Sequence, residues 1–260
     1  MSEIRDRLNK DPLSGIPARP ASFAVRLRAL TPARVALGRT GISQRTPDLL
    51  DFQRAHAQAR DAVLARLEVS SLAASLSAIT GDEVLVLHSA ATDRTTYLQR
   101  PDLGRQLSQA SRACLPAGDW DLALIVADGL SAIAVERHAP PLLQQLLPRL
   151  EGWRLAPLAI VEQGRVAIGD EIGAALRTQL SVVLIGERPG LSSPDSLGVY
   201  ITWEPRPGRI DAERNCISNI RIGGLDYFTA AVQLSHYVTE ARRRRLTGIA
   251  LKEGSHLLHS

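Results

Sequence analysis

From about residue 82 onward, short apolar runs rich in β-branched residues alternate with segments of helical periodicity, and this limits the possible folds most strongly. The runs that favour strands are Glu83–His88, Asp121–Ala127, Leu155–Val161, Ser181–Gly186 and Val199–Trp203. Segments that favour helices lie at 101–114, 131–150, 170–178 and 226–246, with a break expected at Pro140–Pro141. This alternation is typical of α/β proteins. We therefore expect a Rossmann-like, mainly parallel sheet with helices on both faces, over residues 81–253.

Two segments precede this predicted domain. Residues 1–45 are rich in Arg and Ser and contain four prolines, so we expect an extended N-terminal arm of mostly irregular chain. A helical segment is expected over 46–80, because Thr46, Pro47 and Asp48 suit the start of a helix. His56 lies on the apolar stripe of that helix, either as a packed, hydrogen-bonded histidine or as an interface residue.

The net charge of +4 is concentrated at the N-terminus. Residues 1–45 hold nine basic and three acidic residues, so the remainder is slightly acidic, and no nucleic-acid partner is expected. No apolar run approaches the ~18–20 residues of a membrane helix, and the first residues lack the apolar stretch of a signal peptide. Two cysteines, Cys114 and Cys216, fit a reducing compartment. We expect a cytoplasmic protein without a membrane partner.

The motifs of most self-contained enzymes are missing. The sequence has no GxxxxGK[ST], GxGxxG, GxSxG or HExxH, and its six histidines lack metal-ligand spacing. We therefore expect neither a catalytic constellation nor a metal site in this chain. A sheet of the predicted class binds ligands beyond the carboxyl ends of its strands. Candidate segments at or near such ends are VADGLS (126–131), GRVAIGDEIG (164–173) and SVVLIGERPG (181–190).

Two residues near these ends have alternative interpretations. Glu187 ends a buried strand, where a carboxylate is costly unless it is paired or hydrogen-bonded. It either pairs locally with Arg188 or the backbone, or it faces a ligand in the crevice. Cys216 lies in the polar segment DAERNCISNIRIGG (211–224), where it is either a small buried apolar residue or a ligand contact.

Seven segments in the same order resemble the small (light) subunit of ethanolamine ammonia-lyase, from about Thr31 to Leu251. They are TPARVALGRTG (31–41), LLDFQRAHAQARDAV (49–63), YLQRPDLGRQL (97–107), VADGLS, GRVAIGDEIG, IGERPGL (185–191) and DAERNCISNI (211–220). No single segment is diagnostic, but their order and spacing together are specific. The segment Leu225–Phe228 departs from the turn common in relatives, and residues 254–260 form a tail without a counterpart that we identify.

The resemblance implies an enzyme that converts ethanolamine to acetaldehyde and ammonia by the radical chemistry of adenosylcobalamin. It implies a hetero-oligomer in which a large subunit, a TIM barrel, holds ethanolamine and supplies the catalytic groups. The small subunit closes over cobalamin between the two. Carried over by motif, the cobalamin contacts fall on Val166, Glu187 and Cys216. The missing Asp-x-His-x-x-Gly agrees with the base-on binding of the family.

Two further expectations accompany this resemblance. In some relatives an N-terminal extension directs the enzyme into a bacterial microcompartment, so enclosure in such a shell is a possible location here. The alternative function is a non-catalytic α/β binding or regulatory protein that kept the scaffold. Retention of Glu187, Cys216 and the Gly164–Val166 turn favours the enzyme subunit, since a repurposed scaffold would be free to lose them.

Overall fold

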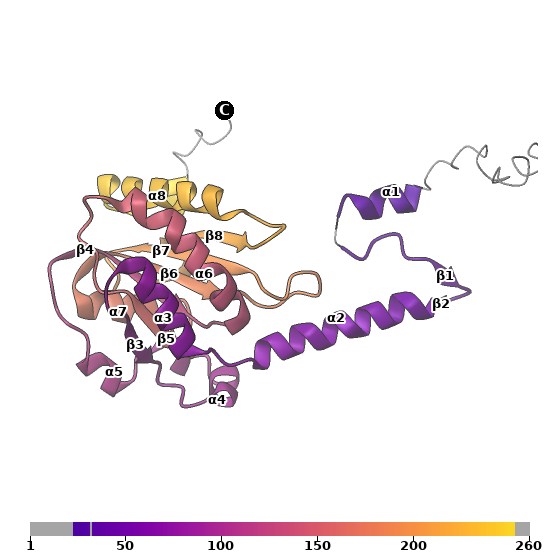
Figure 1. Cartoon of the computed structure of the whole chain (residues 1–260), viewed down its shortest axis with the longest axis horizontal. Helices are drawn as coiled ribbons and strands as arrows, with labels where there is room; N and C mark the ends of the chain where they lie inside the picture. The colour runs from indigo at the N-terminus through magenta and orange to yellow at the C-terminus, as the bar shows by residue number, and fades with distance from the viewer. Residues whose placement is uncertain (1–22, 32, 253–260) are drawn as a thin grey trace, which may run out of the picture. The chain divides into compact units, whose positions relative to one another are not determined.

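A computed structural model describes residues 23–31 and 33–252 of the chain (Figure 1). The predictions for 1–22, for Pro32 and for 253–260, the tail among them, lie outside the described residues. Contacts divide the chain into two compact units, Met1–Gln53 and Arg54–Ser260. The boundaries predicted for the arm, the helical segment and the α/β domain stay predictions.

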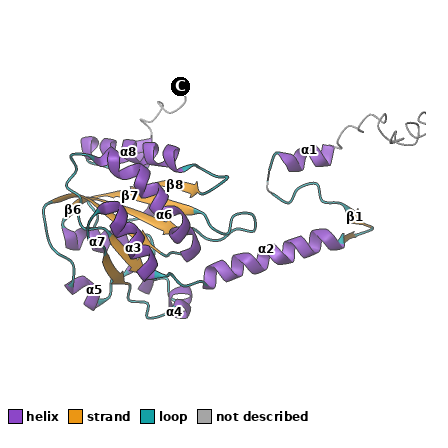
Figure 2. Cartoon of the chain, in the orientation of Figure 1, coloured by secondary structure: helices purple, strands orange, loops and turns teal. Residues whose placement is uncertain are grey.

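The second unit is built on a six-stranded sheet in the order β3-β5-β4-β6-β7-β8 (Figure 2). The strands are β3 (Leu85–His88), β4 (Trp120–Ala127), β5 (Ala159–Glu162), β6 (Thr178–Gly186), β7 (Leu197–Trp203) and β8 (Arg214–Ile220). The pairs β3–β5, β5–β4 and β4–β6 are parallel, whereas β7 runs antiparallel to both of its neighbours. The predicted mainly parallel α/β fold is therefore confirmed, with one reversed strand.

Helices cover both faces of this sheet. Strand alternation directs Leu122, Leu124 and Val126 of β4 into a core with α3 (Val69–Thr80), α6 (Ala132–Leu146) and α8 (Tyr227–Arg244). Ala123, Ile125 and Ala127 point to the opposite face and pack with α7 (Ile168–Leu176). Below, we call this opposite side the α7 face of the sheet.

The break expected at Pro140–Pro141 is wrong, because α6 continues through both prolines. Each proline removes a backbone hydrogen bond. Eight residues of α6 are buried, however, and Ser131 caps its first turn by accepting a hydrogen bond from the Ala134 N–H. Packing on the sheet thus outweighs the local preference. A short 3₁₀ helix, η2 (Leu147–Leu150), follows.

Other elements differ from the predictions in detail. The prediction of a single helix at 101–114 is wrong. Two short helices, η1 (Leu103–Arg105) and α5 (Gln109–Ala113), replace it, because Leu107 between them pairs with Ser89 in an isolated β-bridge. Helix α4 (Arg94–Gln99), β8 and η3 (Asp211–Glu213) were not predicted.

The predicted 170–178 and 226–246 helices correspond to α7 and α8. Asp226 caps α8, so the unusual Leu225–Phe228 segment is a helix start. The last described helix is α9 (Ile249–Lys252).

The first unit contains helix α1 (Phe23–Ala29) and a hairpin of β1 (Arg39–Thr40) and β2 (Ser43–Gln44). Helix α1 was not predicted, and the expectation of mostly irregular chain over residues 1–45 stays a prediction. Helix α2 (Thr46–Leu64) begins where it was predicted. His56 is exposed, so it is not the packed core histidine that was one of its two interpretations.

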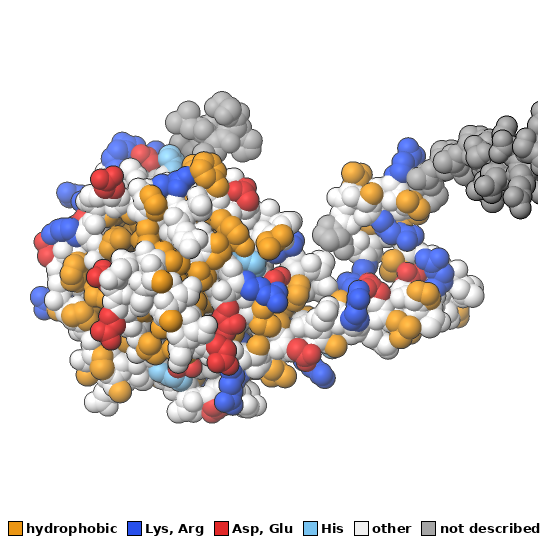
Figure 3. Space-filling model, viewed as in Figure 1, with side chains coloured by type: hydrophobic (Ala, Val, Ile, Leu, Met, Phe, Trp, Pro, Cys, Tyr) orange, Lys and Arg blue, Asp and Glu red, His pale blue; other side chains and the backbone are white. Residues whose placement is uncertain are grey.

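Within the described residues, no single helix has the length and apolar character to cross a membrane, although α2 and α3, bent by 77°, pass that test as a pair. On the face drawn in Figure 3, acidic and basic side chains are interspersed rather than gathered into one basic surface.

Candidate functional site

A cavity of about 440 Å³ opens at the carboxyl ends of β4 and β6 and at the turn that follows β5. It is lined by Tyr97, Gly129, Leu130, Arg165, Val166, Ile185, Gly186, Glu187, Arg188 and Tyr200. Strand β4 lies between β5 and β6. The chain therefore passes from β4 to β5 on one side of β4 and later forms β6 on its other side. The cavity thus lies at the switch point where sheets of this class bind ligands.

Glycines let the turns after β4 and β6 pack backbone against backbone. Gly129 has a φ of +57°, and a Cβ there would lie 2.3 Å from the Gly186 carbonyl oxygen. The Leu130 N–H donates to that same oxygen at 2.9 Å. Because neither turn has a side chain at these positions, the two turns lie directly against each other at the cavity. This accounts for the glycines of the VADGLS and IGERPGL segments.

Glu187 lies directly after β6 and its side chain is half-buried at the cavity. Its carboxylate accepts from the backbone N–H of Asn219, at 3.4 Å to Oε1 and 3.2 Å to Oε2. The backbone interpretation is therefore supported, although the donor lies 32 residues away rather than locally. One long contact leaves acceptor capacity, since a carboxylate has about four lone-pair sites. Glu187 can still accept hydrogen bonds from a ligand.

Tyr200 connects Glu187 with Cys216. Tyr200 lines the cavity from β7, and Cys216 is its direct cross-strand partner in β8. Burial raises the pKa of the Tyr200 hydroxyl, and the Cys216 thiol and the Glu187 carboxylate raise it further. Cys216 is exposed, so the interpretation as a buried apolar residue is wrong. It does not itself line the cavity, but lies one strand away from it.

Val166 lines the cavity from the turn between β5 and α7, half-buried, and packs in the same cluster as Tyr200. The neighbouring Arg165 stacks its guanidinium 4.2 Å from the centre of the Tyr97 ring. Tyr97 is fully buried and donates to the Gly164 carbonyl oxygen at 3.1 Å. Helix α4 thereby fixes the turn that carries Val166.

A buried ion pair between Arg94 and Asp128 holds the turns that line the cavity. Arg94 Nη1 lies 3.4 Å from Asp128 Oδ2 and donates to the Gly129 carbonyl oxygen at 2.8 Å. Asp128 also accepts from the Gly164 N–H at 3.0 Å, which ties the turn after β4 to the turn after β5. Burial raises the Asp128 pKa to about 6, although Arg94 acts in the opposite direction.

Three residues at this site, Tyr97, Arg94 and Gly198, were not predicted from the sequence. Tyr97 begins the YLQRPDLGRQL segment, which carried the resemblance, but a tyrosine on a short helix gives no signal of its own. Gly198 makes room for the Glu187 side chain, because a Cβ there would lie 3.0 Å from Glu187 Oε1. Only the pairing of β7 with β6 reveals this contact.

The site offers acceptor, donor and apolar groups rather than metal ligands. Among the described residues, no three His, Cys, Asp or Glu side chains gather to hold a metal ion. A buried Arg165 Nε has no hydrogen-bond partner in that part of the chain. Amide groups, which both donate and accept, fit Glu187 and the arginines. A larger cavity of about 600 Å³ lies near the amino ends of β4 and β5, but none of the three predicted contact residues lines it.

Comparison with known proteins identifies what this chain is similar to. Residues 21–252 match the family described as ethanolamine ammonia-lyase light chain (EutC). The ethanolamine ammonia-lyase small subunit of Pseudomonas paraeruginosa is 57% identical over 235 residues, which is 87% of this chain and 86% of that protein. Those of Pseudomonas syringae pv. tomato and Xanthomonas campestris pv. campestris are each 54% identical, over 99% and 90% of this chain and 88% and 89% of theirs.

Proposed function

Because the chain belongs to the ethanolamine ammonia-lyase light-chain family, we propose that it is the small subunit of an adenosylcobalamin-dependent ammonia-lyase and forms one wall of the cobalamin site. One observation carries the proposal: Val166 and Glu187 line the same cavity, and Tyr200 links that cavity to Cys216. When bound, adenosylcobalamin supplies the radical chemistry that converts ethanolamine to acetaldehyde and ammonia.

The donor set of the cavity fits the rim of a corrin. Glu187 accepts hydrogen bonds from the N–H groups of the corrin side-chain amides. Val166 and Tyr200 present apolar surface that excludes water from the ligand, and Cys216 extends that surface along the α7 face. Pockets that enclose a drug-sized ligand measure roughly 300–1,000 Å³. Cobalamin is much larger than such ligands, so a cavity of about 440 Å³ receives only part of it.

The remainder of the site belongs, in this proposal, to a large subunit. The small subunit binds and orients cobalamin, and the large subunit, a TIM barrel, holds ethanolamine and supplies the catalytic groups. Base-on binding follows the family, because the chain lacks an Asp-x-His-x-x-Gly segment. We place the enzyme in the cytoplasm, since its two cysteines, Cys114 and Cys216, are not joined in a disulfide. Enclosure in a microcompartment stays a prediction.

Cobalamin titration of the complex of both subunits tests the proposal. We expect Glu187→Ala to weaken binding by about ten- to hundredfold, because a hydrogen bond to a charged group contributes about 1.5–3 kcal/mol. Glu162→Ala is the matched control, since Glu162 is a half-buried carboxylate at the end of β5, which β4 separates from β6, and does not line the cavity. Equal affinity of folded Glu187→Ala and wild-type complexes would leave Glu187 with a structural role only.

A further inference from the structure

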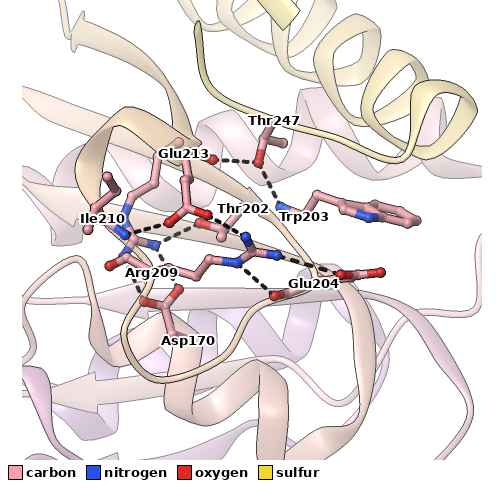
Figure 4. Close-up of polar contacts among 9 residues, drawn as sticks. Asp170, Thr202, Trp203, Glu204, Arg209, Ile210, Glu213 and Thr247 are labelled. Atoms are coloured by element: carbon pink, nitrogen blue, oxygen red, sulfur yellow. Dashed lines mark hydrogen bonds and ion pairs between the residues drawn. The ribbon is translucent and has the colours of Figure 1, made fainter. Parts of the chain in front are cut away.

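A buried ion pair between Asp170, labelled in Figure 4, and Arg214 joins α7 to β8 on the α7 face of the sheet. Arg214 Nη1 lies 2.7 Å from Asp170 Oδ1, and Arg214 Nη2 lies 2.6 Å from Asp170 Oδ2. Both side chains are 2% exposed. Two parallel hydrogen bonds fix the angle between a guanidinium and a carboxylate as well as their distance.

Further hydrogen bonds hold the Arg214 side chain in place. Nη1 also donates to Thr202 Oγ1 at 2.9 Å, and Nη2 donates to the Arg209 carbonyl oxygen at 3.0 Å. Arg209 in turn forms ion pairs with Glu213 and Glu204 (Figure 4). The guanidinium of Arg214 is thus oriented by β7 and by the loop before β8, so it has little freedom to follow a displaced Asp170.

The position of this pair relates it to the proposed cobalamin surface. Asp170 lies in the first turn of α7, four residues after Val166. Arg214 begins β8, two residues before Cys216, so strand alternation places both side chains on the same face. The cross-strand partner of Arg214 is Thr202, and that of Cys216 is Tyr200. The pair therefore links the helix that follows the Val166 turn with the strand that carries Cys216.

We propose that Asp170 and Arg214 are positioning residues for cobalamin, which set the spacing between the Val166 turn and the Cys216 strand. This inference rests on the proposed function. A buried ion pair is weak evidence for stability, because apolar residues of similar volume often replace one without loss. The forked geometry fixes the Val166 turn and the Cys216 strand relative to each other, which a flexible apolar contact does not do. Loops and strands that carry ligand contacts need such support to hold their geometry.

The double variant Asp170→Leu/Arg214→Met separates positioning from stability. It replaces both charges, so it leaves no unpaired buried charge, and we expect the subunit to fold and to assemble with the large subunit. We expect its complex to bind cobalamin about ten- to hundredfold more weakly, the range found when residues that orient ligating groups are lost. Arg214→Lys keeps the charge but not the fork, so it should also weaken binding.

Asn215→Ala is the matched control from the opposite side of the same strand. The Asn215 amide donates to the Gly248 carbonyl oxygen at 3.1 Å and accepts from the Gly248 N–H at 2.8 Å. Its loss should lower the Tm of the subunit and leave the cobalamin affinity unchanged. If Asn215→Ala weakens binding as much as the double variant does, the effect is one of general stability and the inference is overturned.

Alkylation of Cys216 provides a readout other than activity or affinity. In the wild-type complex, hydroxocobalamin should slow the reaction of Cys216 with iodoacetamide, whereas exposed Cys114, in another part of the unit, serves as the internal control. The double variant should lose this protection at the cobalamin concentration that protects the wild type. Wild-type complex that neither binds nor protects would contradict the proposed function itself. Wild-type and double-variant complexes that bind and protect equally would overturn this inference alone.

Discussion

Asp128 shows how burial changes the chemistry of one residue at the cavity. Its carboxyl is 2% exposed, and burial raises its pKa from 3.8 to about 6. Between pH 3.8 and about 6, the folded state therefore keeps a proton on this carboxyl that the unfolded state has already released. The contribution of this residue to stability is fully present below about pH 4 and is lost as the pH rises through about 6.

This shift predicts a pH-dependent difference between wild type and Asp128→Asn. The free energy of unfolding of the wild type, relative to the variant, should fall as the pH rises from 4 to 7. Urea unfolding at several pH values measures it. A relative gain in wild-type stability over the same interval would mean that the attraction of Arg94 outweighs burial and that the Asp128 pKa is depressed.

Gly198 is a second residue whose role depends on a close contact. A Cβ at this position would lie 3.0 Å from Oε1 and 3.1 Å from Cγ of Glu187, so Gly198→Ala must displace that side chain. We expect weaker cobalamin binding by the complex, with a smaller loss than that caused by Glu187→Ala. In the Glu187→Ala background, Gly198→Ala should have no further effect, because the two changes act on the same contact. Additive losses in the cobalamin titration would contradict this.

At the scale of elements, α6 depends on its cap and on its packing. Ser131 is fully buried, accepts from the Ala134 N–H at 3.3 Å and donates to the Pro194 carbonyl oxygen at 3.1 Å. Ser131→Ala should lower the free energy of unfolding by about 1–2 kcal/mol, measured in urea. Ser108 caps the five-residue α5 in the same manner, so Ser108→Ala should have a smaller effect. The reverse order would show that α6 does not need its cap.

Elements with periodic apolar residues could be predicted from the sequence, and polar ones could not. The strands β4 and β6 are continuous buried runs, and α8 has regular buried positions, so each was identified near its observed bounds. Strand β8 was missed because Arg214, Asn215, Ser218 and Asn219 hide its alternation. Its polar side chains are bonded to α7 and to the segment before α9, which only the folded chain brings close.

The same limit applies to the site. The segments that contain Val166 and Glu187 were singled out at strand ends, because the topology of a parallel sheet brings such ends together. Glu187 stood out as a carboxylate that ends a buried strand, whereas Val166 was named only through the resemblance. Tyr97 and Arg94 support the site from α4, which lies outside the strand-end segments. Asp170 lies in the 164–173 segment, but its pairing with Arg214 could not be inferred from the sequence. Distant residues become neighbours only through the sheet order, in which β8 joins beside β7 at the edge.

At the scale of the whole molecule, the proposed function makes the cavity one side of a site. Radical catalysis requires a cofactor sealed from water and side reactions. We therefore predict that the purified chain alone shows no ethanolamine deamination with saturating adenosylcobalamin, and that addition of the large subunit produces turnover. Acetaldehyde release measures this, with mass spectrometry to verify that no large subunit contaminates the chain. In the proposed function Glu187 contacts the cofactor and not ethanolamine, so the Glu187→Ala complex should need more cobalamin for half-maximal rate but approach the wild-type rate at saturation. Turnover by the chain alone would require a complete active site within these 260 residues and would contradict the division of labour.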